Sequence, residues 1–384
     1  MNWLRDNILK ILIILGVVVI AIIILAIVIT PRGDSVVSGS KYGELETKLQ
    51  NAAIKYTAKN KKRLPKSTEE VVKIKLKTLQ DNKYIGKLVA VDNRSTVCDG
   101  RVEITKLDEE KEEYRYTPYI SCGKYYTTKN IGNYIIDEET EEGENIRTSG
   151  AGLYKNDNDY IFKGENVNNY IKLDTHLYRI IKIDENESLQ LISVNKTSDS
   201  YLWDDRYNIS KDREIGINDF VKSRLYDTLG TLYEPSKVQG FEVFFTEKEK
   251  DYIVEHDFCI GARALSDVDI ESGAECLETS SLKVGLITID EYARASIDPN
   301  CKSVVDKSCY NYNFFSKLGT KDSYSYMTLT AVKDNTYEYY KVGYDEILTT
   351  KTSNASQIYP VIYINSRTIY SSGTGTASDP YIVR

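Results

Sequence analysis

Histidine is the scarcest ionisable residue of this 384-residue chain, which contains only His176 and His256. Neither stands in an H-E-x-x-H motif or beside a cysteine motif, so neither has the spacing of a zinc ligand. His176 falls in a strand-like run, which favours a structural role. The chain also lacks a G-x-S-x-G motif, a P-loop and a G-x-G-x-x-G motif. We therefore predict no catalytic residue, no cofactor-binding residue and no enzyme activity.

The chain also has no excess of positive charge. The formal net charge is −7, and lysine and glutamate alternate along much of the chain. Such a chain offers no basic face for phosphates, which argues against a nucleic-acid partner. Among aromatic residues, 31 tyrosines stand against 8 phenylalanines and 2 tryptophans. Tyrosine suits recognition surfaces, but it also favours β-strands and is common in products of AT-rich genomes. The tyrosine content therefore fits either a recognition surface or a compositional bias.

One long hydrophobic run interrupts this polar sequence. Residues 11–29 read ILIILGVVVIAIIILAIVI and contain no charged side chain. As a helix, this run and its flanks, residues 8–30, match the roughly 30 Å of hydrocarbon in a bilayer. The run is longer than the apolar region of about 7–15 residues in a cleaved signal peptide. We therefore predict an uncleaved transmembrane anchor at residues 8–30, preceded by a cytoplasmic tail at residues 1–7.

The residues on either side of the run indicate its orientation. Arg5 and Lys10 precede it, whereas Arg32 follows it beside Asp34, which weakly favours a cytoplasmic amino terminus. All six cysteines lie after the run, in even number and at local spacings that suit disulfides formed in an oxidising compartment. We predict a single-pass cell-membrane protein with an extracellular C-terminal domain and three local disulfides, Cys98–Cys122, Cys259–Cys276 and Cys301–Cys309.

Composition divides the rest of the chain into two domains. Residues 31–40 contain proline, glycine and serine and predict a flexible neck. Residues 41–136 combine an amphipathic helix with a β-hairpin and predict a small α+β domain. The acidic, glycine-containing residues 137–153 predict a linker. Residues 154–384 predict a larger head domain.

The head alternates short strand-like runs with a few helices. YIKL, LYRIIKID and LQLISV read as strands, while TEKEKDYIVE and TIDEYARAS read as helices. Each of these helices opens with a capping box, Thr246 with Glu249 and Thr288 with Glu291. No repeat of 20–50 residues is visible, and the mixture of strands and helices predicts an α+β fold class.

The head also carries a family resemblance. It rests on YIKLDTHLYRIIKI, WDDRYN, VGLITIDEYARA, YSYMTLTAV and the closing YPVIYINSRTIYSSGTGTASDPYIV. These segments resemble a family of C-type-lectin-like modules on Firmicute surface proteins, whose fold is distantly related to sulfatase-modifying factors. The resemblance implies a C-type-lectin-like α+β head on a bacterial cell surface. Family members usually carry tryptophan where this chain has Tyr178 and Tyr326, and arginine where it has Tyr359, so no ligand site is carried over.

The small domain resembles a second group. The segments YGELETKLQNAAIKY, VCDGRVEI and YTPYISCGKYYTTK are similar to a small domain found near pilin-like anchors in the same bacteria. The resemblance implies a pilin-like domain next to the membrane. Residues 1–10, MNWLRDNILK, lack the glycine and the Phe-Thr-Leu-Ile-Glu-like start of a prepilin, so we expect no processing by a prepilin peptidase.

One acidic loop suggests a metal. Asp267, Asp269, Glu271 and Glu278 fall at positions 1, 3, 5 and 12 of an EF-hand-like count, although Ser272 occupies position 6, where the turn requires glycine. Calcium is therefore the single cofactor candidate. The alternative is a solvated loop closed by the neighbouring disulfide.

The resulting interpretation is a membrane-anchored extracellular protein that binds or adheres to a protein or glycan ligand, which the sequence does not identify. The first alternative is a structural subunit of a pilin-like or secretion assembly. The second is a formylglycine-generating-like oxidase, because such enzymes of the wider fold use a reactive cysteine pair late in the domain. Here that pair is Cys301 and Cys309, whose spacing favours a structural disulfide.

Overall fold

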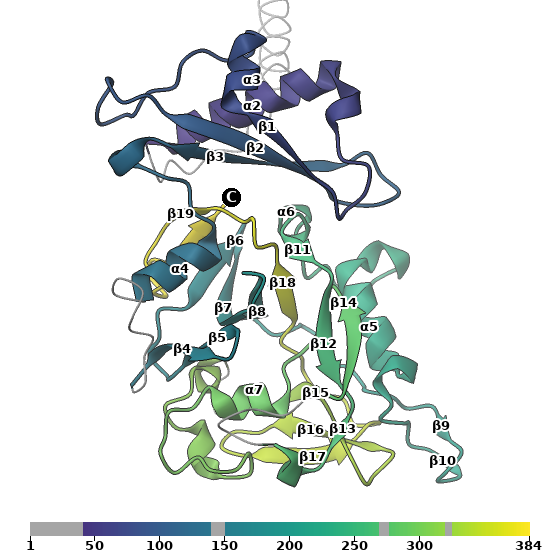
Figure 1. Cartoon of the computed structure of the whole chain (residues 1–384). Coiled ribbons are helices and arrows are strands. Elements are labelled where there is room, and N and C mark those ends of the chain that lie inside the picture. The colour runs from purple at the N-terminus through teal and green to yellow at the C-terminus, as the bar shows by residue number, and fades with distance from the viewer. Residues whose placement is uncertain (1–40, 140–149, 269–275, 319–324) are drawn as a thin grey trace, which may run out of the picture.

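The computed structural model describes residues 41–139, 150–268, 276–318 and 325–384. They form a small domain that lies against one end of a larger head (Figure 1). Each domain has its own cluster of buried apolar side chains.

The fold class expected from the sequence needs a correction. The described residues are α+β, with more strand than helix, and none of their helices is long and apolar enough to cross a membrane. The longest of them, α2 (Gly43–Lys59), has 17 residues and carries lysine and glutamate along its length. The predicted anchor at residues 8–30 lies outside the described residues, as do the tail at 1–7 and the neck at 31–40. The fold class that the described residues support is thus α+β, and the transmembrane helix of the expected fold class is not found among them.

The small domain packs one helix on a three-stranded antiparallel sheet. Helix α2 lies across β2 (Asp99–Lys106) and β3 (Tyr114–Ser121), with β1 (Val71–Lys75) on the other side of β2. Its buried stripe contains Leu49, Ala52, Ala53 and Tyr56, which recur at the helical spacing of three and four residues. Short helices complete the domain: α3 (Leu76–Asp81), η1 (Lys61–Arg63) and η2 (Gly123–Tyr125).

A nine-stranded sheet forms the centre of the head. Its order is β11-β18-β8-β7-β6-β20-β19, and the β4-β5 hairpin joins it at β7. All its strand pairs are antiparallel except β20 with β6, which are parallel. This pair places the end of the chain beside a strand that lies some 200 residues earlier in the sequence. The bounds are β4 (Gly152–Asn156), β5 (Asp159–Lys163), β6 (Tyr170–Leu173), β7 (His176–Ile183), β8 (Leu189–Ser193), β11 (Ile253–Val254), β18 (Val361–Ile364), β19 (Tyr370–Ser372) and β20 (Tyr381–Val383).

Three smaller sheets surround this centre. The four-stranded sheet has the order β13-β15-β16-β17, and β12-β14 and β9-β10 are two-stranded arms (Figure 1). Their bounds are β9 (Tyr207–Asn208), β10 (Arg213–Glu214), β12 (His256–Ile260), β13 (Ala262–Arg263), β14 (Glu278–Leu282), β15 (Tyr326–Val332), β16 (Glu338–Val342) and β17 (Ile347–Lys351).

Short helices fill the spaces between the sheets. They are α4 (Ile131–Glu139), α5 (Arg224–Tyr233), α6 (Glu247–Lys250), α7 (Ile289–Arg294), η4 (Phe220–Lys222), η5 (Pro235–Lys237), η6 (Leu265–Asp267), η7 (Lys307–Tyr310) and η8 (Phe314–Lys317). Both predicted capping boxes are present, Thr246 with Glu249 on α6 and Thr288 with Glu291 on α7. Local sequence therefore fixes where these two helices begin.

All six cysteines are paired, as expected from their spacing. The disulfides are Cys98–Cys122, Cys259–Cys276 and Cys301–Cys309. The first joins neighbouring ends of β2 and β3 in the small domain. The second ties β12 to the residues just before β14, and the third lies within a loop of the head.

Helix α4 follows the small domain in sequence but packs with the head. Its Ile131 and Ile135 are fully buried in the main apolar cluster of the head. From the sequence, residues 131–136 are expected to belong to the small domain, because the acidic stretch begins only afterwards. The packing instead puts the change of domain close to Asn130, whose backbone bridges to Ile369.

Candidate ligand-binding site

A cavity of about 150 Å³ lies in the head between the main sheet, helix α7 and the β12-β14 arm. Charged side chains dominate its walls, with apolar atoms from Phe162, Ile181, Phe258 and Leu286 between them. The charged residues are Asp159, Lys182, Asp257, Arg263, Asp290, Glu291 and Arg294. Charged groups that converge on one cavity, with shifted pKa values at Lys182 and Glu291, make it a candidate functional site.

Strand register brings three of the lining side chains into one row. Lys182 on β7 pairs with Gln190 on β8, and Gln190 pairs with Tyr363 on β18. Directly paired residues share one face of a sheet, so all three side chains point toward α7. A β-bulge interrupts the β7-β8 register between Ile180 and Lys182. Bulges re-aim side chains, and this one lies at the cavity wall.

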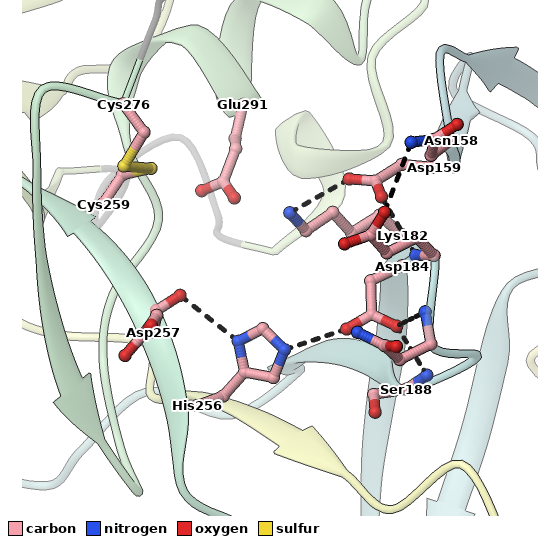
Figure 2. Close-up of polar contacts among 12 residues, drawn as sticks. Asn158, Asp159, Lys182, Asp184, Ser188, His256, Asp257, Cys259, Cys276 and Glu291 are labelled. Carbon is pink, nitrogen blue, oxygen red and sulfur yellow. Dashed lines mark hydrogen bonds and ion pairs between the residues drawn. A yellow bond between two sulfur atoms is a disulfide. The ribbon is translucent and has the colours of Figure 1, made fainter.

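Lys182 is held by the acidic groups around it. Its Nζ lies 3.4 Å from Asp159 Oδ2 and 5.9 Å from the ring centre of Tyr363. Burial lowers the pKa of Lys182, but the nearby Tyr363, Glu291 and Asp159 outweigh burial and leave that pKa raised. Figure 2 shows the Lys182 ammonium and the Glu291 carboxylate facing each other. Lys182 is therefore a cation that already has its partners.

Glu291 joins the capping box of α7 to this row. Its Oε2 accepts a hydrogen bond of 2.9 Å from the backbone N–H of Thr288, and Gln190 provides a side-chain hydrogen bond. Burial raises the pKa of Glu291, the charge of Asp290 adds to the effect, and Lys182 opposes it. The capping residue thus also shapes the cavity.

Two lining side chains keep buried polar atoms without a partner. Gln190 is 2% exposed, and its Oε1 has no hydrogen-bond partner among the described residues. The Nε and Nη2 atoms of Arg294, at the end of α7, are likewise buried and unpaired within the described ranges. Leaving such a group unsatisfied costs about 1–3 kcal/mol. These atoms are therefore candidate groups for binding a ligand in the cavity.

His256 lies beside the cavity and uses both ring nitrogens. Nε2 lies 2.8 Å from Asp184 Oδ2 and Nδ1 lies 3.2 Å from the carbonyl oxygen of Asp257, as Figure 2 shows. The ring also stacks on Tyr363 at a centroid distance of 3.7 Å. Both partners accept hydrogen bonds, so both contacts form together only when each nitrogen carries a proton.

His176 has a similar setting at α6. Its Nδ1 lies 2.9 Å from both carboxylate oxygens of Glu249, and the hydroxyl of Tyr178 donates to the same carboxylate at 3.1 Å. Burial raises the pKa of Tyr178, and the charge of Glu249 raises it further. These contacts fasten α6 to β7, which is a structural role.

The calcium candidates are not assembled in the described residues. Asp269 and Glu271 lie outside them. Asp267 Oδ2 lies 3.0 Å from Lys333 Nζ and accepts a hydrogen bond from the backbone of Ala264, while Glu278 lies on β14. Across the described ranges, no three His, Cys, Asp or Glu side chains are grouped to hold a metal ion.

The positions where the chain departs from the lectin-like pattern are core positions. Tyr178, Tyr326 and Tyr359 are 0%, 1% and 4% exposed. The late cysteine pair is also internal, since Cys301 and Cys309 belong to a buried cluster around α7 and β16. A closed, buried disulfide in a packed cluster has the form of a structural cross-link.

Sequence reasoning had singled out Glu291 as a cap but not its neighbours in the cavity. One signal was present, because Arg294 follows Glu291 by three residues and therefore lies on the same face of α7. Nothing local marks Lys182, Gln190 or Tyr363, whose alignment depends on pairing between distant strands.

No family model matches the chain, and no curated protein or solved structure is significantly similar to it. The resemblances to lectin-like and pilin-like domains stay predictions from the residues that carry them. The function must therefore be argued from the site itself.

Proposed function

We propose that the chain is a binding protein that works outside the cytoplasm and holds a small polar ligand in the cavity beside α7. The observation that carries this proposal is the pair of buried, unpaired polar groups, Gln190 Oε1 and the Arg294 fork, on the wall of one cavity. A ligand that pairs with them removes the penalty of leaving them unsatisfied. Binding is therefore the simplest use of this geometry.

The location outside the cytoplasm is supported by the cysteines. All six form disulfides, and none is free. Disulfides of this kind persist in oxidising compartments and are rare where glutathione keeps thiols reduced. The net charge of −7 suits a solvated exterior and offers nothing to nucleic acid.

Binding is favoured over catalysis by the state of the reactive groups. Both ring nitrogens of His256 already contact acceptor oxygens, those of Asp184 and Asp257. The cysteines nearest to the cavity, Cys259 and Cys276, are bonded to each other. Lys182 is held as a cation by its acidic neighbours. A general base and a nucleophile need a free lone pair, which these groups do not offer.

The test is a thermal-unfolding screen of the full chain, kept oxidised, against small polar molecules at millimolar concentration. A ligand present at 100 times its Kd stabilises the folded state by about 2.7 kcal/mol, which raises the melting temperature measurably. We expect compounds with an acidic group to do so and Arg294→Met to abolish the shift. The matched control is Arg94→Met, an exposed arginine of the small domain. A screen with no stabilising compound, or a shift that survives Arg294→Met, contradicts the proposal.

A further inference from the structure

We infer that the ligand is a small zwitterion, an α-amino acid, whose carboxylate binds Arg294 and whose ammonium group binds Gln190 and the carboxylates around it. This inference rests on the proposed binding function and names its ligand class. Four observations lead to it: the geometry of the free arginine atoms, the acceptor on Gln190, the charge of the wall and the size of the cavity.

The two unpaired atoms of Arg294 are those that can donate parallel hydrogen bonds to the two oxygens of one carboxylate. Nε and Nη2 lie on one edge of the planar guanidinium, and their N–H bonds point in nearly the same direction. Both are buried and have no partner among the described residues. Arginine forms its strongest contacts with carboxylates through two such parallel hydrogen bonds. An unpaired guanidinium edge on a residue that lines a cavity is therefore a candidate receptor for a planar anion.

The unpaired atom of Gln190, Oε1, is a hydrogen-bond acceptor and needs a donor as its partner. Its amide already binds Glu291, so the orientation of the side chain is fixed and Oε1 is the end left over. An oxygen acceptor pairs with an N–H or O–H group of the ligand. Gln190, Glu291 and Arg294 all line the one cavity of about 150 Å³. One small molecule can therefore reach both.

The charge of the wall favours a ligand with both signs. Four carboxylates, on Asp159, Asp257, Asp290 and Glu291, face three cations, on Lys182, Arg263 and Arg294. A simple anion would pair with Arg294 but meet this surplus of carboxylates. A simple cation or a neutral sugar would leave the charge of Arg294 without an opposite partner. A zwitterion satisfies Arg294 and places its ammonium group among the carboxylates.

The size of the cavity limits the ligand further. A cavity of about 150 Å³ matches the one that holds a benzene molecule in a protein core. An α-amino acid with a small side chain has about the same number of non-hydrogen atoms, on the order of six to ten by that comparison. The apolar wall, with Phe162, Ile181, Phe258 and Leu286, suits an aliphatic side chain.

The experiment compares alanine with two probes that each lack one of its charged groups, propionate and ethylamine, on the full, oxidised chain. Propionate lacks the ammonium group and ethylamine lacks the carboxylate. We expect isothermal titration to give alanine or another small aliphatic amino acid an affinity at least tenfold higher than either partial probe. Inorganic phosphate is the fourth probe and should bind no better than propionate.

Two variants assign the ends of the ligand. Arg294→Lys keeps the charge but removes the fork, and we expect it to weaken amino-acid binding at least tenfold, with Arg94→Lys as the matched control. Gln190→Met should reduce the ratio of alanine affinity to propionate affinity. The probe comparison on the unaltered chain needs neither variant, so it decides the matter even if a variant does not fold.

The outcomes separate the two claims. Equal binding of alanine and propionate, tighter binding of phosphate or ethylamine, or unchanged affinity in Arg294→Lys would overturn the zwitterion while leaving a binding site in place. If none of these probes and no compound of the wider screen binds, the proposed function itself fails.

Discussion

At the scale of single residues, the buried carboxylates of the head take hydrogen bonds first from their own loops and then from distant side chains. Asp184 accepts hydrogen bonds from the backbone N–H groups of Asn186 at 2.9 Å and Ser188 at 2.8 Å. His256, 72 residues further along the chain, adds a third contact. The local contacts explain the turn, while the distant one joins the β12-β14 arm to the main sheet.

Asp184 therefore makes stability depend on acidity. Burial raises its pKa, but the hydrogen bond from His256, that from Ser188 and the attraction to His256 outweigh burial, so the pKa lies below its usual value. A carboxyl group whose pKa is lower in the folded state stabilises the fold at neutral pH. That contribution is lost as the pH falls from about 4, the ordinary value of the group, through the folded-state pKa.

We expect Asp184→Asn to lower the free energy of unfolding by about 1–3 kcal/mol at pH 7, because it removes a charge-assisted hydrogen bond. The difference from the unaltered chain should shrink toward pH 3. Urea unfolding at both pH values measures it, and Asp227→Asn, at an exposed position of α5, is the control. A difference that stays constant between the two pH values would show that the charge of Asp184 does not contribute.

At the scale of elements, helix α5 contains an exposed glycine that its conformation does not require. A Cβ atom built on Gly230 would meet nothing within 4 Å. Glycine in the middle of a helix is less stable than alanine by roughly 0.5–1 kcal/mol, because the unfolded chain has more freedom to lose. We expect Gly230→Ala to raise the free energy of unfolding by that amount in thermal or urea unfolding.

Gly216 provides the opposite case and the control. Its φ is +74°, and an added Cβ would lie 2.0 Å from the backbone oxygen of Asp204. Gly216→Ala should therefore destabilise the head clearly, because backbone atoms would have to move. If both substitutions changed the free energy of unfolding with the same sign, the open space around Gly230 would not decide the effect of its substitution.

The disulfide of the β12-β14 arm should stabilise the element next to the cavity. Cys259 and Cys276 are separated by 17 residues, and closing a loop of about that length contributes about 3 kcal/mol in the chain-entropy model. We expect the double variant Cys259→Ser with Cys276→Ser to lose free energy of unfolding of that order. It should also bind ligand more weakly, because Cys259 lines the cavity. If the double variant and the unaltered chain had the same free energy of unfolding under oxidising conditions, this prediction would be wrong.

The sequence was most informative where a signal is local. YIKL coincides with β6, and both capping boxes mark true helix starts, because a strand run or a cap needs only a few neighbouring residues. The cavity was not visible in the same way. Its row of Lys182, Gln190 and Tyr363 depends on the register of three strands and a β-bulge, and register is set by packing over the whole sheet.

At the scale of the whole molecule, the two domains are joined by more than the covalent chain. Arg367 lies 3.4 Å from Glu103 of β2, and Arg384 pairs with the buried Glu46 of α2. Figure 1 shows the C-terminus between the two domains, next to the small one. The small domain is thus packed against the last strands of the head.

The acidic stretch suggested a linker at residues 137–153, of which residues 140–149 lie outside the described residues. Composition reports which residues can face water, and residues 137–139, with two glutamates, are the last of helix α4. Ile131 and Ile135 are buried in the same apolar cluster as Ile183 and Leu189 of the head. A local reading of charge cannot detect that contact.

This packing leads to a prediction about where the head begins. Burying an isoleucine side chain stabilises a fold by roughly 1.5–3 kcal/mol. We expect a fragment of residues 130–384 to fold, and a fragment of residues 151–384, which lacks α4, to be less stable by several kcal/mol. Thermal unfolding of the two fragments measures the difference in stability between them.

In the full chain, Ile135→Ala should lower the free energy of unfolding by about 2–5 kcal/mol. The control is Ile54→Ala, since Ile54 is 41% exposed on α2 and should lose little. If the two fragments melted at the same temperature and Ile135→Ala had no effect, α4 would belong to the small domain. The acidic stretch would then be the true boundary.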